Sequence, residues 1–126
     1  YKNMCQLSTQ SFIDGFYVKP RIDDELLERY SEGLICLSAC ISGRIPKLLL
    51  AGQNDAAKEK AMKYKAIFGE DFYIEVQNHG IADELRCLPL LYKLAAECGI
   101  KTVCTNDAHY AEESDAEAQD VLYILV

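Results

Sequence analysis

Three short runs of strand-forming residues, each followed by a helical pattern, are the feature of this sequence that most limits its fold. The runs lie at residues 34–38, 72–76 and 102–105, and small or polar residues follow each of them. The first run is continuously apolar and the third is made of small and β-branched residues, so both are predicted to be buried strands. Strands that alternate with helices form parallel sheets, either as an α/β layer or as part of a barrel. We therefore expect an α/β fold.

The second run alternates between two kinds of side chain, which is typical of a strand with one covered face. Phe72, Ile74 and Val76 fall on the apolar face. Tyr73 and Glu75 fall on the other face, where a glutamate is most often a solvated charge.

Six helical segments are expected, and the clearest is at residues 55–68, with Asn54 as its cap. In the segment 83–98, Pro89 should start a second helix or kink the first. The apolar side of that segment is predicted to carry Leu85, Leu88, Leu91, Tyr92, Ala95 and Cys98. The other segments lie near residues 2–16, at 24–30 after the cap Asp23, at 45–51, and from near Ser114, where Ser114 and Glu117 have the spacing of a capping box. Residues 17–20 are expected to be extended, because Lys19 precedes a proline.

The length of 126 residues suits one domain with a core of its own. No apolar run approaches the roughly 20 residues of a transmembrane helix and no signal segment opens the chain, so we expect a cytoplasmic protein without membrane contact. The start at Tyr1 and the apolar end suggest a piece of a longer polypeptide. A net charge of −7 argues against nucleic acid lying across most of the surface.

Six cysteines are present without a Cys-x-x-Cys pair, which makes a zinc knuckle or a redox dithiol unexpected. Cys36, Cys87 and Cys104 lie in apolar patterns. We expect most of the cysteines, with Cys5 and Cys98 among them, to be core thiols in a reducing compartment.

Polar or thiol groups follow each predicted strand, namely Cys40, His79, and the pair Asp107 and His109. If the strands are parallel neighbours, these groups meet at one rim, and such donors suit a zinc or manganese ion. Asp107 and His109 are two positions apart on an extended segment, so they point to the same side. Each residue also has an ordinary interpretation. Cys40 and His79 can be turn residues, Asp107 can cap the following turn, and His109 can be a surface residue.

Four stretches resemble, in order, the PHP (polymerase and histidinol phosphatase) domain of DnaE-type bacterial replicative polymerases, the alpha subunits of DNA polymerase III. They are residues 17–23, residues 33–40 with 43–46, residues 72–80 and residues 105–110. The resemblance implies a distorted (βα)7 barrel whose strand ends hold up to three zinc or manganese ions. In some members these ions serve 3′ to 5′ exonuclease proofreading.

The resemblance also assigns residues. Cys40 matches the metal-binding cysteine of the family, and Asp107 and His109 match its last Asp-x-His motif. His79 and Asn106 match positions near the site that are not expected to be ligands. The opening His-x-His motif and the next ligands of the family precede Tyr1, and the polymerase palm with its magnesium site lies outside this chain. Residues 1–126 therefore resemble the later part of a PHP domain.

The resemblance implies part of a DNA-directed DNA polymerase, a nucleotidyltransferase of DNA replication, that contributes ligands to a phosphoesterase or exonuclease site. The isolated chain is expected to be inactive and to self-associate through exposed sheet edges. Its expected partners are DNA, through the parent polymerase, and other replisome subunits. The alternative is a non-catalytic PHP scaffold that has lost its metals. An independent small phosphoesterase is a third possibility, poorly supported because the ligand set is incomplete.

Overall fold

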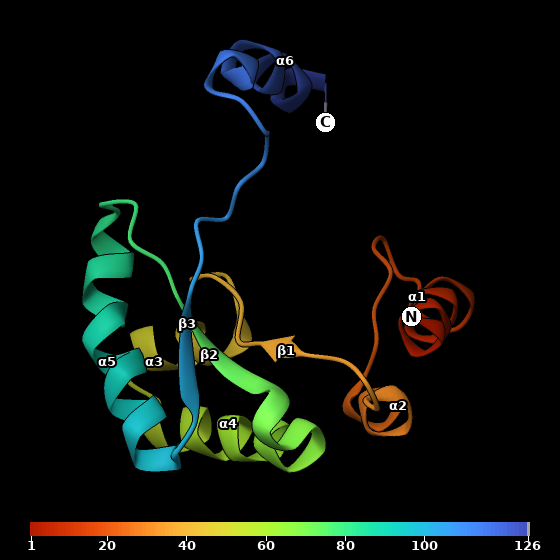
Figure 1. The fold of residues 1–126 in the computed structure, drawn as a ribbon, viewed down its shortest axis with the longest axis vertical. Helices are drawn as coiled ribbons and strands as arrows, with labels where there is room; N and C mark the ends of the chain where they lie inside the picture. Colours follow the sequence, from red (N-terminus) through yellow and green to blue (C-terminus); the bar gives the residue numbers. More distant parts are fainter. Residues whose placement is uncertain (126) are drawn as a thin grey trace.

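The computed structural model describes residues 1–125, and its central layer is a parallel sheet of three strands in the order β1-β2-β3 (Figure 1). The strands are β1 (Cys36–Leu37), β2 (Phe72–Val76) and β3 (Lys101–Cys104). Cys36 pairs with Phe72, and Ile74 pairs with Thr102, both in parallel register. The predicted parallel α/β arrangement is therefore confirmed for this part of the fold, and a (βα)7 barrel stays a prediction.

Six α-helices and two 3₁₀ turns surround or flank this sheet in the described chain. Figure 1 shows α3, α4 and α5 on one side of the sheet, while α1 with α2, and separately α6, lie away from it. The helices are α1 (Lys2–Ile13), α2 (Asp24–Tyr30), α3 (Arg44–Leu50), α4 (Asn54–Phe68), α5 (Ala82–Cys98) and α6 (Ala116–Leu125), and the 3₁₀ turns are η1 (Gly69–Asp71) and η2 (Glu113–Asp115). No helix within residues 1–125 has both the length and the apolar character that a membrane crossing needs.

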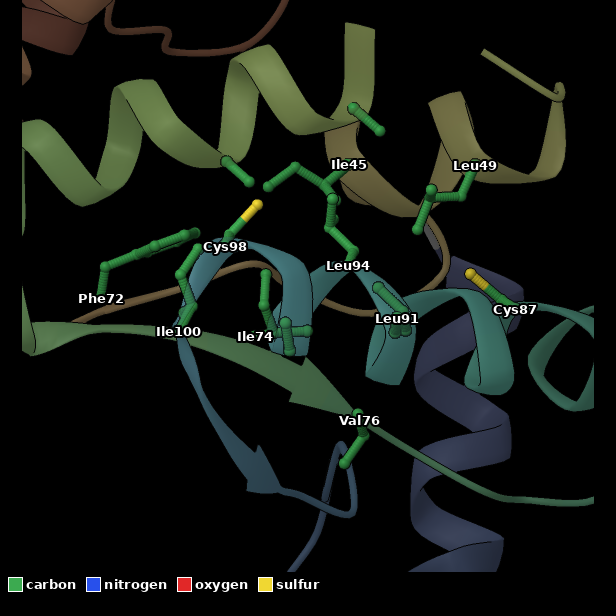
Figure 2. Close-up of a cluster of buried hydrophobic side chains, with 13 residues drawn as sticks. Ile45, Leu49, Phe72, Ile74, Val76, Cys87, Leu91, Leu94, Cys98 and Ile100 are labelled. Atoms are coloured by element: carbon green, nitrogen blue, oxygen red, sulfur yellow. The ribbon is translucent and has the colours of Figure 1, made fainter. Parts of the chain in front are cut away.

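The core lies between the central strand and the helices on its covered face (Figure 2). Phe72, Ile74 and Val76 are buried, whereas Tyr73 and Glu75 on the opposite face are half-buried, so the predicted alternation of β2 is confirmed. The helices and the residue just before β3 complete the core with Ile45, Leu49, Ala57, Ala61, Cys87, Leu91, Leu94, Ala95, Cys98 and Ile100. Burial of this apolar surface is the main stabilising contribution to the fold.

The prediction of burial was wrong for the two outer strands. Ile35, just before β1, is 69% exposed, and Thr102 and Cys104 in β3 are exposed. Because the helices cover one face only, and no strand within residues 1–125 pairs with the outer edges of β1 or β3, only β2 is enclosed. All six cysteines are free thiols, but Cys5 and Cys104 are exposed, so the expectation of a core position is wrong for these two.

Several local predictions for the helices also need correction. Asn54 is the first residue of α4 rather than its cap, and no side chain caps that end. Pro89 lies inside a single helix and does not start a second one, because it sits on the exposed side of α5 where a missing N–H is tolerated. A kink at Pro89 stays a prediction. On the same helix Leu85 and Tyr92 are each 51% exposed, because Cys87 and Leu94 take the inner positions.

The capping box at η2 is formed by Glu112 and Asp115, not by Ser114 and Glu117.

Between α1 and α2, residues 17–19 form a tight turn, whereas extended chain was expected for residues 17–20. Val18 has a φ of 65°, and Tyr17 and Lys19 exchange backbone hydrogen bonds of 3.2 and 2.7 Å. Asp23 caps α2 as predicted, since its carboxylate accepts from the Leu26 N–H at 2.9 Å. An isolated turn of this kind orders only a few residues.

An ion pair joins α2 to α4. Both carboxylate oxygens of Asp24 lie 2.7 Å from Lys60 Nζ, and Lys63 Nζ lies 2.9 Å from Oδ2. The hydrogen bonds from Lys60 and Lys63 lower the pKa of Asp24. These contacts link α2 to α4, although α2 has no fully buried residue of its own.

Candidate site at the carboxyl ends of the strands

One open cavity of about 530 Å³ lies beside the segments that follow β1, β2 and β3. Cys40 comes from the turn after β1, His79 from the segment after β2, and Asp107 and His109 from the segment after β3. The other lining residues are Ile41, Ser42, Gln77, Ile81, Glu84, Asn106, Ala108 and Tyr110. The parallel order places the ends of the three strands on one side of the sheet, where loops can direct side chains into a shared space.

The cavity does not contain a formed metal site. Among the described residues, no three His, Cys, Asp or Glu side chains lie in a group that could hold an ion. Cys40, Asp107 and His109 therefore fit zinc or manganese in donor chemistry, but they are not gathered at coordination distance from one another. Whether they are metal ligands stays a prediction.

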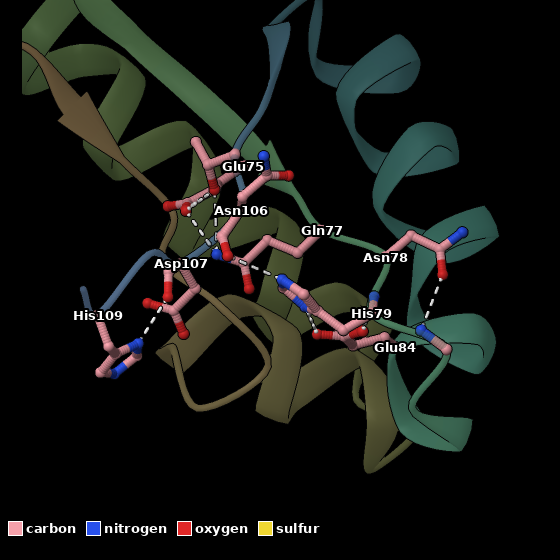
Figure 3. Close-up of polar contacts among 10 residues, drawn as sticks. Glu75, Gln77, Asn78, His79, Glu84, Asn106, Asp107 and His109 are labelled. Carbon is pink, nitrogen blue, oxygen red and sulfur yellow. Dashed lines mark hydrogen bonds and ion pairs between the residues drawn. The ribbon is translucent and has the colours of Figure 1, made fainter. Parts of the chain in front are cut away.

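The ring of His109 is oriented by the backbone of Asp107. Its Nδ1 lies 2.6 Å from the Asp107 carbonyl oxygen, which can only accept a hydrogen bond, so Nδ1 carries the proton (Figure 3). In the neutral ring this leaves Nε2 as the nitrogen with a lone pair. A ring N–H donated to a backbone carbonyl is the usual arrangement for a histidine whose other nitrogen binds a metal.

His79 is held by two acceptors, one at each ring nitrogen. Nδ1 lies 2.8 Å from Glu84 Oε1, and Nε2 lies 2.9 Å from the backbone oxygen of Asn106 (Figure 3). A carboxylate and a carbonyl both accept hydrogen bonds, so both contacts are satisfied when the ring carries a proton on each nitrogen. The hydrogen bond to Glu84, followed by the one to Asn106, raises the pKa of His79. In this arrangement His79 has no lone pair for a metal, and it is not a simple turn residue either.

Glu84 is a site residue that the sequence reasoning missed. Its side chain is 3% exposed and lies in the first turn of α5, and its Oε2 accepts the backbone N–H of His79 at 2.7 Å. The hydrogen bonds from the His79 ring and backbone lower the pKa of Glu84. A signal was present in the sequence, because Glu84 falls on the same helical face as Cys87 and Leu91, where an acidic residue needs a partner.

A second polar cluster ties β2 to the end of β3. Gln77 Nε2 lies 2.9 Å from Glu75 Oε1 and 3.0 Å from Thr105 Oγ1, and the Thr105 hydroxyl also donates to Glu75. Gln77 is 7% exposed. Glu75 is therefore a hydrogen-bonded group at the site rather than a solvated charge, which corrects the expectation from the alternating pattern.

The His79 and Glu84 pair predicts how stability depends on pH. Because the His79 pKa is raised from its ordinary 6.5, its contribution is complete below about pH 6.5 and is lost as the pH rises through the folded-state value. Because the Glu84 pKa is lowered from 4.5, its contribution is complete above about pH 4.5 and is lost as the pH falls through its folded-state value. We expect the loss of unfolding free energy in His79→Ala to be largest between these values and to shrink at about pH 8.5.

Urea unfolding at several pH values measures this dependence. The matched control is His79→Ala introduced into Glu84→Gln, where the loss should vary less with pH because the carboxylate is gone. A loss that stays constant from about pH 5.5 to 8.5 would contradict the ion pair.

Comparison with known proteins places these residues in context. The PHP domain profile matches residues 1–79, which include Cys40 and His79 and stop before Asp107. The DNA polymerase III subunit alpha of Treponema pallidum is 53% identical over 97% of this chain and 10% of that protein. The corresponding subunits of Borreliella burgdorferi and Deinococcus radiodurans are 48% and 40% identical, each over 97% of this chain and over 11% and 9% of their own lengths. The chain spans about a tenth of these relatives.

Proposed function

This chain belongs to the PHP domain family, as part of the PHP domain of a DnaE-type DNA polymerase III alpha subunit, and on that premise we propose that it contributes to a metal-dependent phosphoesterase site. The proposed reaction is 3′ to 5′ exonucleolytic release of nucleotides. Cys40, Asp107 and His109 are the proposed metal donors, and zinc or manganese is the proposed ion.

The observation that carries the proposal is the shared cavity. Residues as far apart in the sequence as Cys40 and His109 line one open space of about 530 Å³ at the strand ends. A thiol, a carboxylate and an imidazole are the donors that zinc uses in proteins, and the His109 proton on Nδ1 leaves Nε2 for a metal. Three donors are too few for the cluster that the family implies, so further ligands are needed.

In the proposed site the ion and the residues of this chain would have different roles. A bound divalent ion would supply positive charge next to a phosphodiester and make a water acidic at neutral pH. The residues of this chain would hold the ion and orient the loops that bear the donors. We propose that the isolated chain neither polymerises nucleotides nor digests DNA, and that contacts with DNA and replisome subunits belong to the whole polymerase, whose magnesium site lies outside this chain.

A second candidate function is a structural PHP scaffold without metals. It is favoured by one observation, that no three candidate ligands among the described residues are gathered around a point that could hold an ion. The hydrogen bonds that hold His79 and Thr105 would then serve only to stabilise the fold.

Zinc binding by the full-length polymerase subunit that contains this chain distinguishes the metal-dependent site from the metal-free scaffold. If Cys40 is a ligand, Cys40→Ser should weaken zinc binding by at least about tenfold in a competition titration with a coloured chelator. Cys87→Ser is the matched control, because Cys87 is 1% exposed and its Sγ donates to the Pro46 carbonyl at 3.9 Å, so this variant should lose stability but keep its zinc. Absence of zinc binding in the unmodified protein would favour the scaffold, and equal zinc affinity in Cys40→Ser and the unmodified protein would exclude Cys40 as a ligand.

A further inference from the structure

We propose that Glu84 and His79 are positioning residues that fix the segment Asn106–His109 and so place Asp107 and His109 at the cavity. The part of this inference that concerns metal binding rests on the proposed function. The part that concerns the conformation of the segment does not. Neither residue is proposed to touch metal or substrate, and both act through the backbone of Asn106.

The first step is the anchoring of His79 on α5. Glu84 is 3% exposed and accepts two hydrogen bonds from His79, one from the ring Nδ1 at 2.8 Å and one from the backbone N–H at 2.7 Å. Two bonds from one residue to one buried carboxylate fix both its backbone and its ring. His79 is therefore anchored to the first turn of a 17-residue helix whose inner face is part of the core.

The second step links His79 to the segment after β3. Nε2 donates to the Asn106 carbonyl at 2.9 Å, which fixes the peptide plane between Asn106 and Asp107. Asp107 has a φ of 49°, a left-handed conformation that is uncommon for a residue other than glycine. A left-handed conformation at such a residue persists where neighbouring contacts stabilise it. The hydrogen bond from His79 acts on the Asn106–Asp107 peptide group, next to this strained residue.

The third step is the attachment of Thr105, which precedes the segment, to β2. The Thr105 N–H donates to the Val76 carbonyl at 3.2 Å, and its hydroxyl donates to Glu75, so the chain is fixed to β2 up to Thr105. The hydrogen bond from His79 to the Asn106 carbonyl fixes one further residue of the chain. The segment that carries both proposed donors starts at that point, as Figure 3 shows.

Two other roles for the pair conflict with the contacts. His79 uses both ring nitrogens as donors, so it cannot also bind a metal or accept a proton from a substrate. Glu84 is buried and holds two donors, so it is not placed to act as a general base. Holding the segment is the role that uses every observed hydrogen bond of the pair.

Hydrogen–deuterium exchange on the unmodified chain and three variants tests the inference. Glu84→Gln keeps the size of the side chain but can no longer accept both His79 donors, and His79→Ala removes the link to Asn106. Asp83→Asn is the matched control, because Asp83 neighbours Glu84 on α5 but, within residues 1–125, pairs only with Arg86, at 2.8 Å on the surface. Glu84→Gln and His79→Ala should speed exchange of the Thr105 amide, whose bond to the Val76 carbonyl is the last one before the segment, at least about tenfold, with exchange in β2 unchanged. Asp83→Asn should leave both regions unchanged.

The second measurement is a zinc titration of the same variants made in the full-length polymerase subunit that contains this chain. Loss of positioning should weaken zinc binding by about tenfold in Glu84→Gln and not in Asp83→Asn. Exchange of the Thr105 amide that is no faster in Glu84→Gln than in Asp83→Asn would overturn the inference. So would faster exchange with zinc affinity equal to that of the unmodified protein. Faster exchange in a protein that binds no zinc even when unmodified would support the hold on the segment and overturn the proposed metal function instead.

Discussion

Replacing Phe72 with alanine is expected to lower the free energy of unfolding by about 3–5 kcal/mol, the largest effect of any substitution considered for this chain. Phe72 is 2% exposed and opens β2, the only strand with neighbours on both edges in the described sheet. Its ring lies 5.5 Å from the ring of Tyr64 on α4, centroid to centroid. The substitution therefore removes a buried ring and an aromatic pair, and it leaves a cavity where the sheet meets the helices. Urea unfolding followed by circular dichroism measures the loss.

The same substitution at Phe12 is the matched control. Phe12 is 59% exposed on α1 and stacks on Phe16, with ring centroids 6.2 Å apart. Phe12→Ala should change the free energy of unfolding by no more than about 0.5 kcal/mol. Equal losses at the two positions would show that the core is not where the structure places it.

The central strand was predictable because its signal is local. Alternation of large apolar residues with Tyr73 and Glu75 requires only that one face be covered, and the helical patterns beside it supply that cover. Burial of the outer strands was not predictable in the same way. Residues such as Ile35 are apolar whether or not a further strand or helix covers them, so their exposure depends on neighbours that the run itself does not specify.

The location of the site followed from topology, whereas its hydrogen bonds did not. Parallel strands bring Cys40, His79 and Asp107 to one rim, and this could be inferred from the alternation of strands and helices. The role of His79 depends on a backbone carbonyl 27 positions away. The role of Glu84 depends on a turn that brings His79 back to the start of α5. A carbonyl acceptor has no sequence signature, because every residue carries one.

Gly43→Ala is expected to disturb the turn that carries Cys40 and to lower the free energy of unfolding by about 1–3 kcal/mol. A Cβ atom at Gly43 would lie 2.5 Å from the carbonyl oxygen of Ser38 and 3.0 Å from that of Cys40. The Gly43 N–H also donates to the Cys40 carbonyl at 2.7 Å, so the turn cannot open without losing this bond. Because the crowding atoms belong to the backbone, the chain itself must move, and Cys40 moves with it.

Gly33→Ala separates this steric effect from a purely conformational one. A Cβ at Gly33 would meet no atom within 4 Å, but its φ of 71° lies in the left-handed region, so the expected cost is about 1 kcal/mol without any change at Cys40. The rate of alkylation of each cysteine, mapped by mass spectrometry, reports on the turn, with the exposed Cys5 and Cys104 as internal references. We expect Gly43→Ala to change the relative rate at Cys40 and Gly33→Ala to leave it unchanged. If both variants leave that rate unchanged and lose similar stability, the close packing of Gly43 does not determine where Cys40 lies, and the first of the three proposed metal donors loses its structural support.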